Sequence, residues 1–272
     1  RTRSYNLVMK FHAIQHDVIP ANASATEQCI EAIIAESFIA KGDFVVLPEM
    51  TTTGFSIDIN AISQGDAVAW GCQISKQRGI WLQVGWANRH ENRASNCVSI
   101  CTPSGEILTT YEKVFTCNPF GENQVIDKGN SICIVEIEGR KICPLICYDL
   151  RFPELWRLAT LAGAEVFTNS ANWPIKRIYS WKALLVARAI ENQAQVIGCN
   201  RIGHDDVAHW GGTSIAISEE GIILACATET EPECLSASFA KSSSESWRNE
   251  FKVLQDTDNS LLGKIQVTHV NA

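Results

Sequence analysis

The sequence predicts an α/β protein. Short apolar runs rich in β-branched residues alternate with amphipathic stretches, which is the pattern of strands alternating with helices. The chain has 272 residues and 46% hydrophobic content, so it can bury a large core. We therefore expect residues 1–272 to form a single domain.

The expected elements follow from this alternation in chain order. Strands are predicted at residues 7–15, 44–47, 80–86, 97–101, 107–111, 141–147, 165–168, 195–199, 213–217, 222–227 and 234–239. Helices are predicted at residues 26–40, 67–78, 153–162, 180–193 and 244–254. The third helix has the clearest limits, because Pro153 suits a first helical position and Gly163 suits a helix end.

Charge and cysteine content exclude several function classes. The formal net charge of -7 offers no basic surface for nucleic acid or for an anionic membrane. The 11 cysteines include no CxxC pair, so neither a disulfide framework nor a zinc ribbon is indicated, and a reducing compartment fits best. No apolar run approaches a membrane span. We expect a soluble cytoplasmic protein whose partner is a small molecule.

Cys147 stands at a chemically useful position. It ends the predicted strand 141–147 and precedes a polar turn and a helix. A strand-to-helix turn exposes a side chain at the carboxyl edge of a sheet, where backbone N–H groups point at bound anions. The alternative is a small buried hydrophobe, the commoner fate of a free cysteine. We interpret nine other cysteines in predicted elements in that second way: Cys29, Cys72, Cys97, Cys101, Cys133, Cys143, Cys199, Cys226 and Cys234.

A catalytic thiol needs a nearby base and a cation, because it is mostly protonated at neutral pH. Glu49 and Lys113 each come just after a predicted strand. Taken singly, each is more often a solvated charge at a strand terminus. If the three strands lie parallel in one sheet, however, both side chains converge with Cys147 at one edge.

Two further features are weaker. His204 and His209 flank two aspartates but have no third ligand at a suitable spacing, so we expect a solvated loop and no metal site. Trp173 follows a predicted strand and is expected to line a pocket, although large aromatic side chains most often fill a core.

Three segments together resemble the signature segments of the nitrilase, or carbon–nitrogen hydrolase, superfamily. They are residues 45–55 (VVLPEMTTTGF), 111–113 (YEK) and 146–154 (ICYDLRFPE), in matching order and spacing. The likeness continues through residues 172–174 (NWP), 187–193 (ARAIENQ) and 199–203 (CNRIG). Within the superfamily, the sequence is most similar to ω-amidases.

The resemblance implies a four-layer α-β-β-α sandwich of the nitrilase type that forms homodimers through a helical face. It implies a catalytic Glu-Lys-Cys set at Glu49, Lys113 and Cys147, with a second active-site glutamate at Glu122 and no metal or organic cofactor. The chain departs from the family pattern at Thr51 and in residues 114–117. Both departures are expected near the pocket mouth, where they affect the choice of substrate more than the chemistry.

The predicted function is hydrolysis of a small carboxylated amide, 2-oxoglutaramate or 2-oxosuccinamate, through a cysteine thioester. Glu49 takes the thiol proton as Cys147 attacks the amide carbonyl. Lys113 and the backbone N–H of Tyr148 stabilise the oxyanion, and Glu122 orients Glu49 or Lys113. Two alternatives stay open. The same triad supports nitrilase, aliphatic amidase or N-carbamoyl hydrolase activity, and a chain that lost turnover would be a non-catalytic small-molecule binder. The intact triad argues against the binder.

A substrate carboxylate requires a cation other than Lys113. Arg177 is the candidate, because it lies four residues after Trp173 and an arginine fork holds a carboxylate through two hydrogen bonds. The alternative is a solvated loop charge. Arg151 is the weaker candidate, since its place between Asp149 and Glu154 predicts a structural ion pair.

Overall fold

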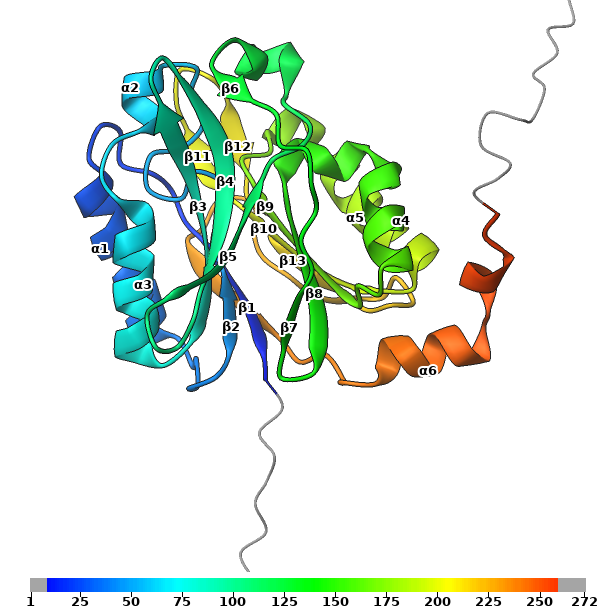
Figure 1. Ribbon diagram of the computed structural model, residues 1–272. Coiled ribbons are helices and arrows are strands. Elements are labelled where there is room, and N and C mark those ends of the chain that lie inside the picture. The colour runs from blue at the N-terminus through cyan, green and yellow to red at the C-terminus, as the bar shows by residue number, and fades with distance from the viewer. Residues whose placement is uncertain (1–8, 259–272) are drawn as a thin grey trace, which may run out of the picture.

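Two β-sheets pack face to face, and helices cover the outer face of each sheet (Figure 1). The structure is a computed structural model that describes residues 9–258. It has the four-layer α-β-β-α arrangement that the sequence predicts.

The first sheet is mixed. Its strands run in the order β15-β1-β2-β3-β4-β5, with β6 paired to β4. The central strands β1, β2 and β3 are parallel to one another, whereas β4, β5 and β15 pair antiparallel with their neighbours. The bounds are β1 Phe11–Gln15, β2 Phe44–Val46, β3 Trp81–His90, β4 Arg93–Cys101, β5 Ile107–Glu112, β6 Ile126–Asp127 and β15 Glu233–Ala237.

The second sheet has the order β14-β13-β10-β9-β8-β7, and its central strands β8, β9 and β10 are parallel. The bounds are β7 Val135–Ile137, β8 Arg140–Ile146, β9 Val166–Ala171, β10 Gln195–Asn200, β13 Ile215–Ile217 and β14 Ile223–Cys226. A separate hairpin is formed by β11 Ile202–His204 and β12 His209–Gly211.

The helices divide between the two outer faces. In Figure 1, α1 and α3 lie outside the first sheet, α4 and α5 lie outside the second, and α6 extends after β15. The α-helices are α1 Ala23–Glu36, α2 Ile59–Ile62, α3 Ala67–Arg78, α4 Pro153–Leu161, α5 Ile178–Asn192 and α6 Ser243–Glu250. The short 3-10 helices are η1 Asn118–Phe120, η2 Glu122–Gln124, η3 Cys147–Arg151, η4 Ile175–Arg177 and η5 Val253–Asp256. Within residues 9–258, no helix is both long and apolar enough to cross a membrane.

Strand β2 shows how the sequence builds the layers. Phe44 and Val46 belong to the apolar cluster between the sheets, and Val45 and Leu47 belong to the cluster under the helices. Successive side chains of a strand point to opposite faces, so a strand that is apolar at every position is buried on both sides.

The contact between the sheets becomes polar near the end of β2. Gln83 on β3 donates to Ser170 Oγ at 2.9 Å and accepts from Thr168 Oγ1 at 2.6 Å, while Ser170 Oγ donates to the Leu47 carbonyl at 2.6 Å. A buried polar group is costly unless it is paired, and here each partner lies on the opposite sheet. These bonds fix the position of one sheet relative to the other at the end of β2.

The predicted elements are confirmed for the central strands and for α3, whose bounds match the prediction. The ends differ elsewhere. β3 continues to His90, the predicted helix 244–254 is split into α6 and η5, and Cys133 precedes β7 without belonging to a strand. Residues 7–8 of the first predicted strand lie outside the described residues. The segment predicted as a loop around His204 and His209 contains the β11-β12 hairpin.

Candidate active site

Three elements from the two sheets bring the predicted catalytic groups together. Glu49 follows β2 and Lys113 follows β5, both in the first sheet, whereas Cys147 follows β8 in the second. The expectation of three parallel strands in one sheet is therefore wrong. The groups meet because the sheets pack face to face.

Lys113 lies at the centre of the cluster and is fully buried. Its Nζ donates to Glu49 Oε1 at 2.7 Å and to both carboxylate oxygens of Glu122 at 2.9 and 3.0 Å. Burial alone would lower the pKa of Lys113, but the attraction of Glu122 and Glu49 outweighs it and raises that pKa well above the usual value. The lysine therefore stays charged, and one cation faces two carboxylates.

The two glutamates share a second donor, Asn96 of β4. Its Nδ2 donates to Glu49 Oε1 at 2.7 Å and to Glu122 Oε1 at 2.8 Å. The backbone N–H of Cys117 donates to Glu122 Oε2 at 2.5 Å. Both oxygens of Glu122 are thus bonded, which fixes its carboxylate against Lys113.

Asn172, just after β9, connects Glu49 to the second sheet. Its backbone N–H donates to Glu49 Oε2 at 3.0 Å, and its side-chain amide donates to the Glu49 carbonyl at 2.8 Å. The Cys147 thiol points at the Asn172 carbonyl, with 3.7 Å between Sγ and O. Asn172 therefore contacts both the expected base and the expected nucleophile.

The turn that carries Glu49 lies directly on β3. A Cβ placed on Gly85 would come within 2.5 Å of the Pro48 carbonyl oxygen and 2.9 Å of Glu49 Cα, so only glycine fits there. Thr51 Oγ1 donates to the same carbonyl at 2.7 Å and accepts the Gly85 N–H at 3.0 Å. Thr51 is fully buried and holds this turn, so the expectation that it lies near the pocket mouth is wrong.

Cys147 has a strained backbone. Its φ is +43°, a left-handed conformation that non-glycine residues adopt at a cost and that is concentrated at functional sites. Its side chain is 8% exposed. Burial, and next the charge of Glu49, raise the pKa of the Cys147 thiol well above its usual value, although Lys113 acts in the opposite direction. The resting group is therefore a thiol that needs a base.

Asp149 fixes the turn after Cys147. Its carboxylate accepts Tyr111 Oη at 2.8 Å and the backbone N–H groups of Phe115 and Ile146 at 3.0 and 3.1 Å. These bonds connect the loop after Lys113 to the turn that holds Cys147. They also leave Arg151 without the ion pair predicted from its position, since no ion pair of Arg151 is found within residues 9–258.

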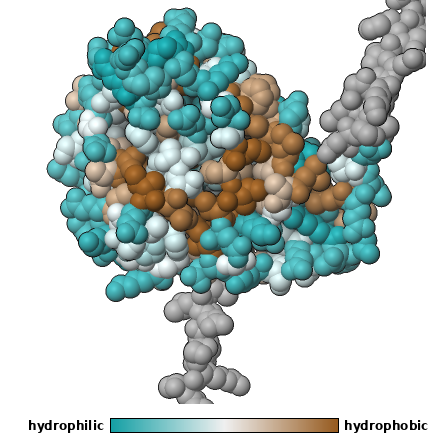
Figure 2. Space-filling view, in the orientation of Figure 1, coloured by the Kyte–Doolittle hydropathy of each residue, from teal (hydrophilic) through white to brown (hydrophobic). Residues whose placement is uncertain are grey.

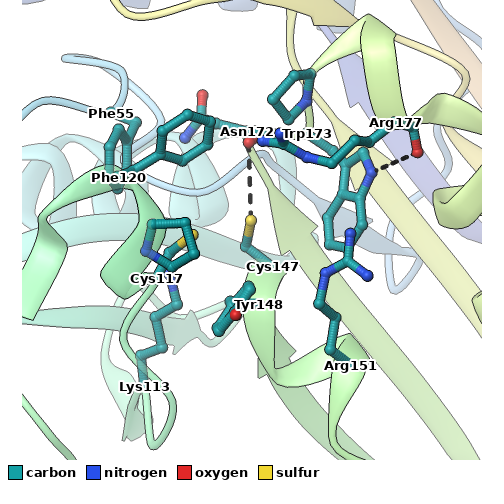
Figure 3. Close-up of a pocket in the computed structure, with 12 residues that line it drawn as sticks. Phe55, Lys113, Cys117, Phe120, Cys147, Tyr148, Arg151, Asn172, Trp173 and Arg177 are labelled. Atoms are coloured by element: carbon teal, nitrogen blue, oxygen red, sulfur yellow. Dashed lines mark hydrogen bonds between the residues drawn. The ribbon is translucent and has the colours of Figure 1, made fainter.

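The cluster opens into a pocket of about 260 Å³ (Figure 3). Lys113 and Cys147 reach its wall, whereas Glu49 and Glu122 are buried behind it. The lining consists of Phe55, Lys113, Cys117, Pro119, Phe120, Cys147, Tyr148, Arg151, Asn172, Trp173, Pro174 and Arg177. Trp173, which the sequence places in a pocket wall, is among these lining residues.

Two guanidinium groups lie in the pocket wall. Arg151 Cζ lies 4.8 Å from the Trp173 ring centroid, and Arg177 Cζ lies 4.9 Å from the centroid of Phe120. Trp173 Nε1 also donates to the Arg177 carbonyl at 2.8 Å, as the dashed line in Figure 3 shows. Like Arg151, Arg177 has no ion pair among the residues that the structure describes.

The described part of the chain contains no cluster of three side chains able to hold a metal ion. His204 and His209 are exposed on the β11-β12 hairpin. Asp205 between them accepts from Arg201 at 2.8 Å and from Trp210 Nε1 at 2.9 Å, so it stabilises the hairpin.

Sequence reasoning missed three residues of the site. Asn96 gave no signal, because a polar residue in a strand is usually read as solvent-facing. Gly85 could have been found, since an isolated glycine inside a strand often marks a close backbone approach. Cys117 lies in the departing segment 114–117, and its place in the pocket wall could not be inferred without the path of that loop.

Residues 13–249 match the profile of the carbon–nitrogen hydrolase family. The chain belongs to this family. The Escherichia coli ω-amidase YafV is 35% identical over 242 residues, which are 88% of this chain and 91% of that protein. The Bacillus subtilis 2-oxoglutaramate amidase is 36% identical over 200 residues, 70% of this chain and 77% of that protein.

Solved structures agree with the family assignment. A carbon–nitrogen hydrolase superfamily protein from Xanthomonas campestris, described with an arsenic adduct in its active site, has a TM-score of 0.84 at 26% identity. The match covers 93% of this chain and 98% of that one. The fold is therefore that of the nitrilase superfamily, and the chain is a hydrolase that acts on the carbon–nitrogen bond of an amide.

Proposed function

We propose that this enzyme hydrolyses the ω-amide of a short 2-oxo dicarboxylic acid monoamide, such as 2-oxoglutaramate or 2-oxosuccinamate, to the 2-oxo dicarboxylate and ammonia. The observation that carries the proposal is the pair Arg151 and Arg177, which lies in the wall of the pocket that holds Cys147. The ω-amidase and 2-oxoglutaramate amidase relatives support the same substrate class.

The aromatic contacts of the two arginines support a role in carboxylate binding. Stacking on Trp173 and Phe120 restricts each guanidinium plane and leaves its N–H edge free for a bidentate bond. Two cations in one small pocket favour a carboxylate next to a 2-oxo group. They disfavour an α-ammonium group, so glutamine and asparagine should be poor substrates.

The size of the pocket supports a short substrate. A volume of about 260 Å³ lies below the range of roughly 300–1,000 Å³ that is usual for drug-sized ligands. The apolar part of the wall, Phe55, Pro119 and Phe120, suits a short methylene chain between the amide and the charged end.

The proposed reaction begins with Glu49 as the general base. Cys147 Sγ attacks the amide carbonyl carbon while its proton passes to the Glu49 carboxylate. Two observations support Glu49 over Glu122. Asn172 holds Glu49 next to Cys147, since it donates to Glu49 Oε2 and its carbonyl lies 3.7 Å from Cys147 Sγ. The charge of Glu49 also raises the pKa of the Cys147 thiol more than the charge of Glu122 does.

Lys113 and the backbone N–H of Tyr148 are the proposed donors to the oxyanion of the tetrahedral intermediate. Both residues line the pocket beside Cys147. Tyr148 lies in the first turn of η3, where N–H groups have no acceptor within the helix. One such donor typically lowers the barrier by roughly 3 to 4 kcal/mol.

The intermediate then collapses to a thioester. The proton held by Glu49 passes to the departing nitrogen, so ammonia leaves as the C–N bond breaks. Water next attacks the thioester and gives its proton to Glu49, which returns the thiol and releases the acid. Glu122 is proposed to orient Lys113 and, through Asn96, Glu49 throughout the cycle.

The assembly proposed is a homodimer through α4 and α5. Leu158 and Leu161 on α4 and Tyr179 and Ile190 on α5 are exposed apolar side chains. Figure 2 shows hydrophobic surface crossing this face of the molecule, including the region where Figure 1 draws these helices. We further propose a cytoplasmic location, which the free state of all eleven cysteines supports.

The substrate proposal is tested by ammonia release from a panel of 2-oxo ω-amides, glutamine, hexanamide, aliphatic nitriles and N-carbamoyl amines. We expect the highest kcat/KM for the 2-oxo ω-amides. Arg177→Ala and Arg151→Ala should each raise KM for 2-oxoglutaramate by roughly 10- to 100-fold, the range expected for a lost charge-assisted bond, and should leave hexanamide nearly unchanged. Equal effects on both amides, or a nitrile as the best substrate, would overturn the proposal.

A further inference from the structure

We propose that Cys72 and Cys101 form a reversible disulfide that fastens α3 to the end of β4 when the protein meets a low-molecular-weight disulfide such as oxidised glutathione. Both cysteines are free in the structure, and their Sγ atoms lie 3.1 Å apart. The pair lies outside the active-site pocket, so the proposal does not depend on the proposed function.

The packing of α3 on the sheet brings the two sulfurs together. A Cβ on Gly71 would come within 2.5 Å of Val84 Cγ2 and 3.6 Å of Cys101 Sγ, so the helix lies directly on β3 and β4 at this turn. One turn later, Ser75 Oγ donates to the Cys101 carbonyl at 3.4 Å. Because both backbones are already held, bond formation requires the sulfurs to approach by only about 1 Å, to the roughly 2.05 Å of a disulfide.

The two thiols differ in access, which suggests the order of events. Cys72 is half-buried and reachable from solvent, whereas Cys101 is fully buried. Burial, together with its contact with Cys72, raises the pKa of Cys101. Cys72 is therefore the thiol that reacts with the oxidant, and Cys101 is the thiol that then attacks the mixed disulfide on Cys72.

The exchange balances with oxidised glutathione as the oxidant. The Cys72 thiolate attacks one sulfur of oxidised glutathione, forms a mixed disulfide and releases one glutathione thiolate. Cys101 Sγ then attacks Cys72 Sγ and releases the second glutathione, which takes up the Cys101 proton. Two protein thiols are oxidised and one molecule of oxidised glutathione is reduced to two thiols.

The expected consequence is a change in stability and not in chemistry. The bond closes the chain between residues 72 and 101, which restricts the unfolded chain and so favours the folded one. Cys101 lies at the end of β4, whereas Asn96, which contacts the catalytic glutamates, lies in the middle of that strand. We therefore expect the bond to leave the active-site contacts intact.

Peptide mapping tests the linkage directly. The protein is incubated with oxidised glutathione, alkylated, and digested with trypsin without reduction. Trypsin leaves Cys72 in residues 42–76 and places Cys97 and Cys101 together in residues 94–113, so fragmentation must assign the sulfur. We expect these two peptides linked through Cys101, two hydrogens lighter than their sum, and separated by dithiothreitol. Glutathione on Cys72 without the linked peptide, or a link through Cys97, would overturn the proposal.

Thermal unfolding supplies an independent readout. Oxidised wild-type protein should melt about 5–10 °C above reduced protein, from the usual stabilisation by a disulfide in a chain of this size. Cys72→Ser, a change at a half-buried site, should abolish the shift, whereas Cys29→Ser at an exposed site on α1 should retain it. An equal shift in Cys72→Ser would show that another cysteine causes it.

Discussion

Two carboxylates share one lysine in the active site, so this buried cluster carries one excess negative charge when its thiol is neutral. Glu122 is bonded through both oxygens to Lys113, which keeps that pair together. The excess charge resides formally on Glu49, which is the group positioned through Asn172 beside Cys147. When the thiol proton passes to Glu49, the excess negative charge moves to Cys147 Sγ and, as the sulfur attacks, to the carbonyl oxygen of the amide. This transfer of charge is the electrostatic basis of the proposed first step.

The first prediction at this scale concerns the base. Glu49→Gln should lower the acylation rate by roughly 10²- to 10⁴-fold, because a neutral amide cannot accept the thiol proton. Substrate binding should persist, since Glu49 lies behind the pocket wall. Single-turnover ammonia release with intact-mass detection of the thioester measures this step. Rapid thioester accumulation in the variant would contradict the assignment of the base.

The sequence singled out Glu49, Lys113, Glu122 and Cys147 as candidates through the family resemblance, but it could not supply their partners. Arg151 was placed in an ion pair because acidic residues lie near it in the chain. In the structure the Asp149 carboxylate is occupied by Tyr111 and two backbone N–H groups, so Arg151 turns to the pocket. The partner of Asp149 is therefore set by a contact between the two sheets, which the sequence alone does not show.

Among the elements, β3 has the most direct effect on the site. Gly85 gives the Glu49 turn room to lie on this strand, because a methyl group would meet backbone atoms of Pro48, Glu49 and Met50 at 2.5 to 2.9 Å. The backbone of β3 at Gly85 therefore cannot move without also moving Glu49.

Gly85→Ala should therefore destabilise the protein by about 1–3 kcal/mol and also lower kcat of the folded fraction. Gly71→Ala is the matched control, since there the added methyl group meets the Val84 side chain. It should lower stability while leaving kcat unchanged. Denaturant unfolding and active-site titration separate the two effects. A Gly85→Ala enzyme with wild-type kcat would show that the turn does not depend on this contact.

Element ends were harder to predict than element cores. Residues 88–93 are polar and charged and look like a loop, yet β3 and β4 stay paired to His90 and Arg93 because the backbone ladder continues. Which sheet a strand joins was also not available from periodicity, because buried strands of both sheets are apolar at successive positions. The single-sheet expectation for Cys147 failed for that reason.

Exposed apolar side chains lie on several elements of the described chain, so a test of assembly needs a control on a different element. Leu158 on α4 and Ile107 on β5 are 55% and 52% exposed. Leu158→Asp should shift the protein from dimer to monomer, because a charge buried in an interface is costly, and Ile107→Asp should not. Light scattering after size exclusion measures the mass. A dimer that persists in Leu158→Asp would place the interface elsewhere.

The four-layer architecture was predictable at this scale through the resemblance, since the pattern of elements alone gives only an α/β protein. That residues 1–272 form one domain stays a prediction. The amide hydrolysis is inferred from the family assignment, and the catalytic groups are inferred from the arrangement around Cys147. A direct test must therefore measure amide hydrolysis in a variant of Cys147.

The central claim is that Cys147 is the nucleophile for amide hydrolysis. The measurement is ammonia release from 2-oxoglutaramate by wild-type, Cys147→Ala and Cys143→Ala proteins of verified folding. Cys143 is the matched control, because it lies in β8 and is fully buried. We predict one ammonia per 2-oxoglutarate from wild type, continued turnover in folded Cys143→Ala, and none above background in Cys147→Ala. Ammonia release by Cys147→Ala at the wild-type rate would contradict the account.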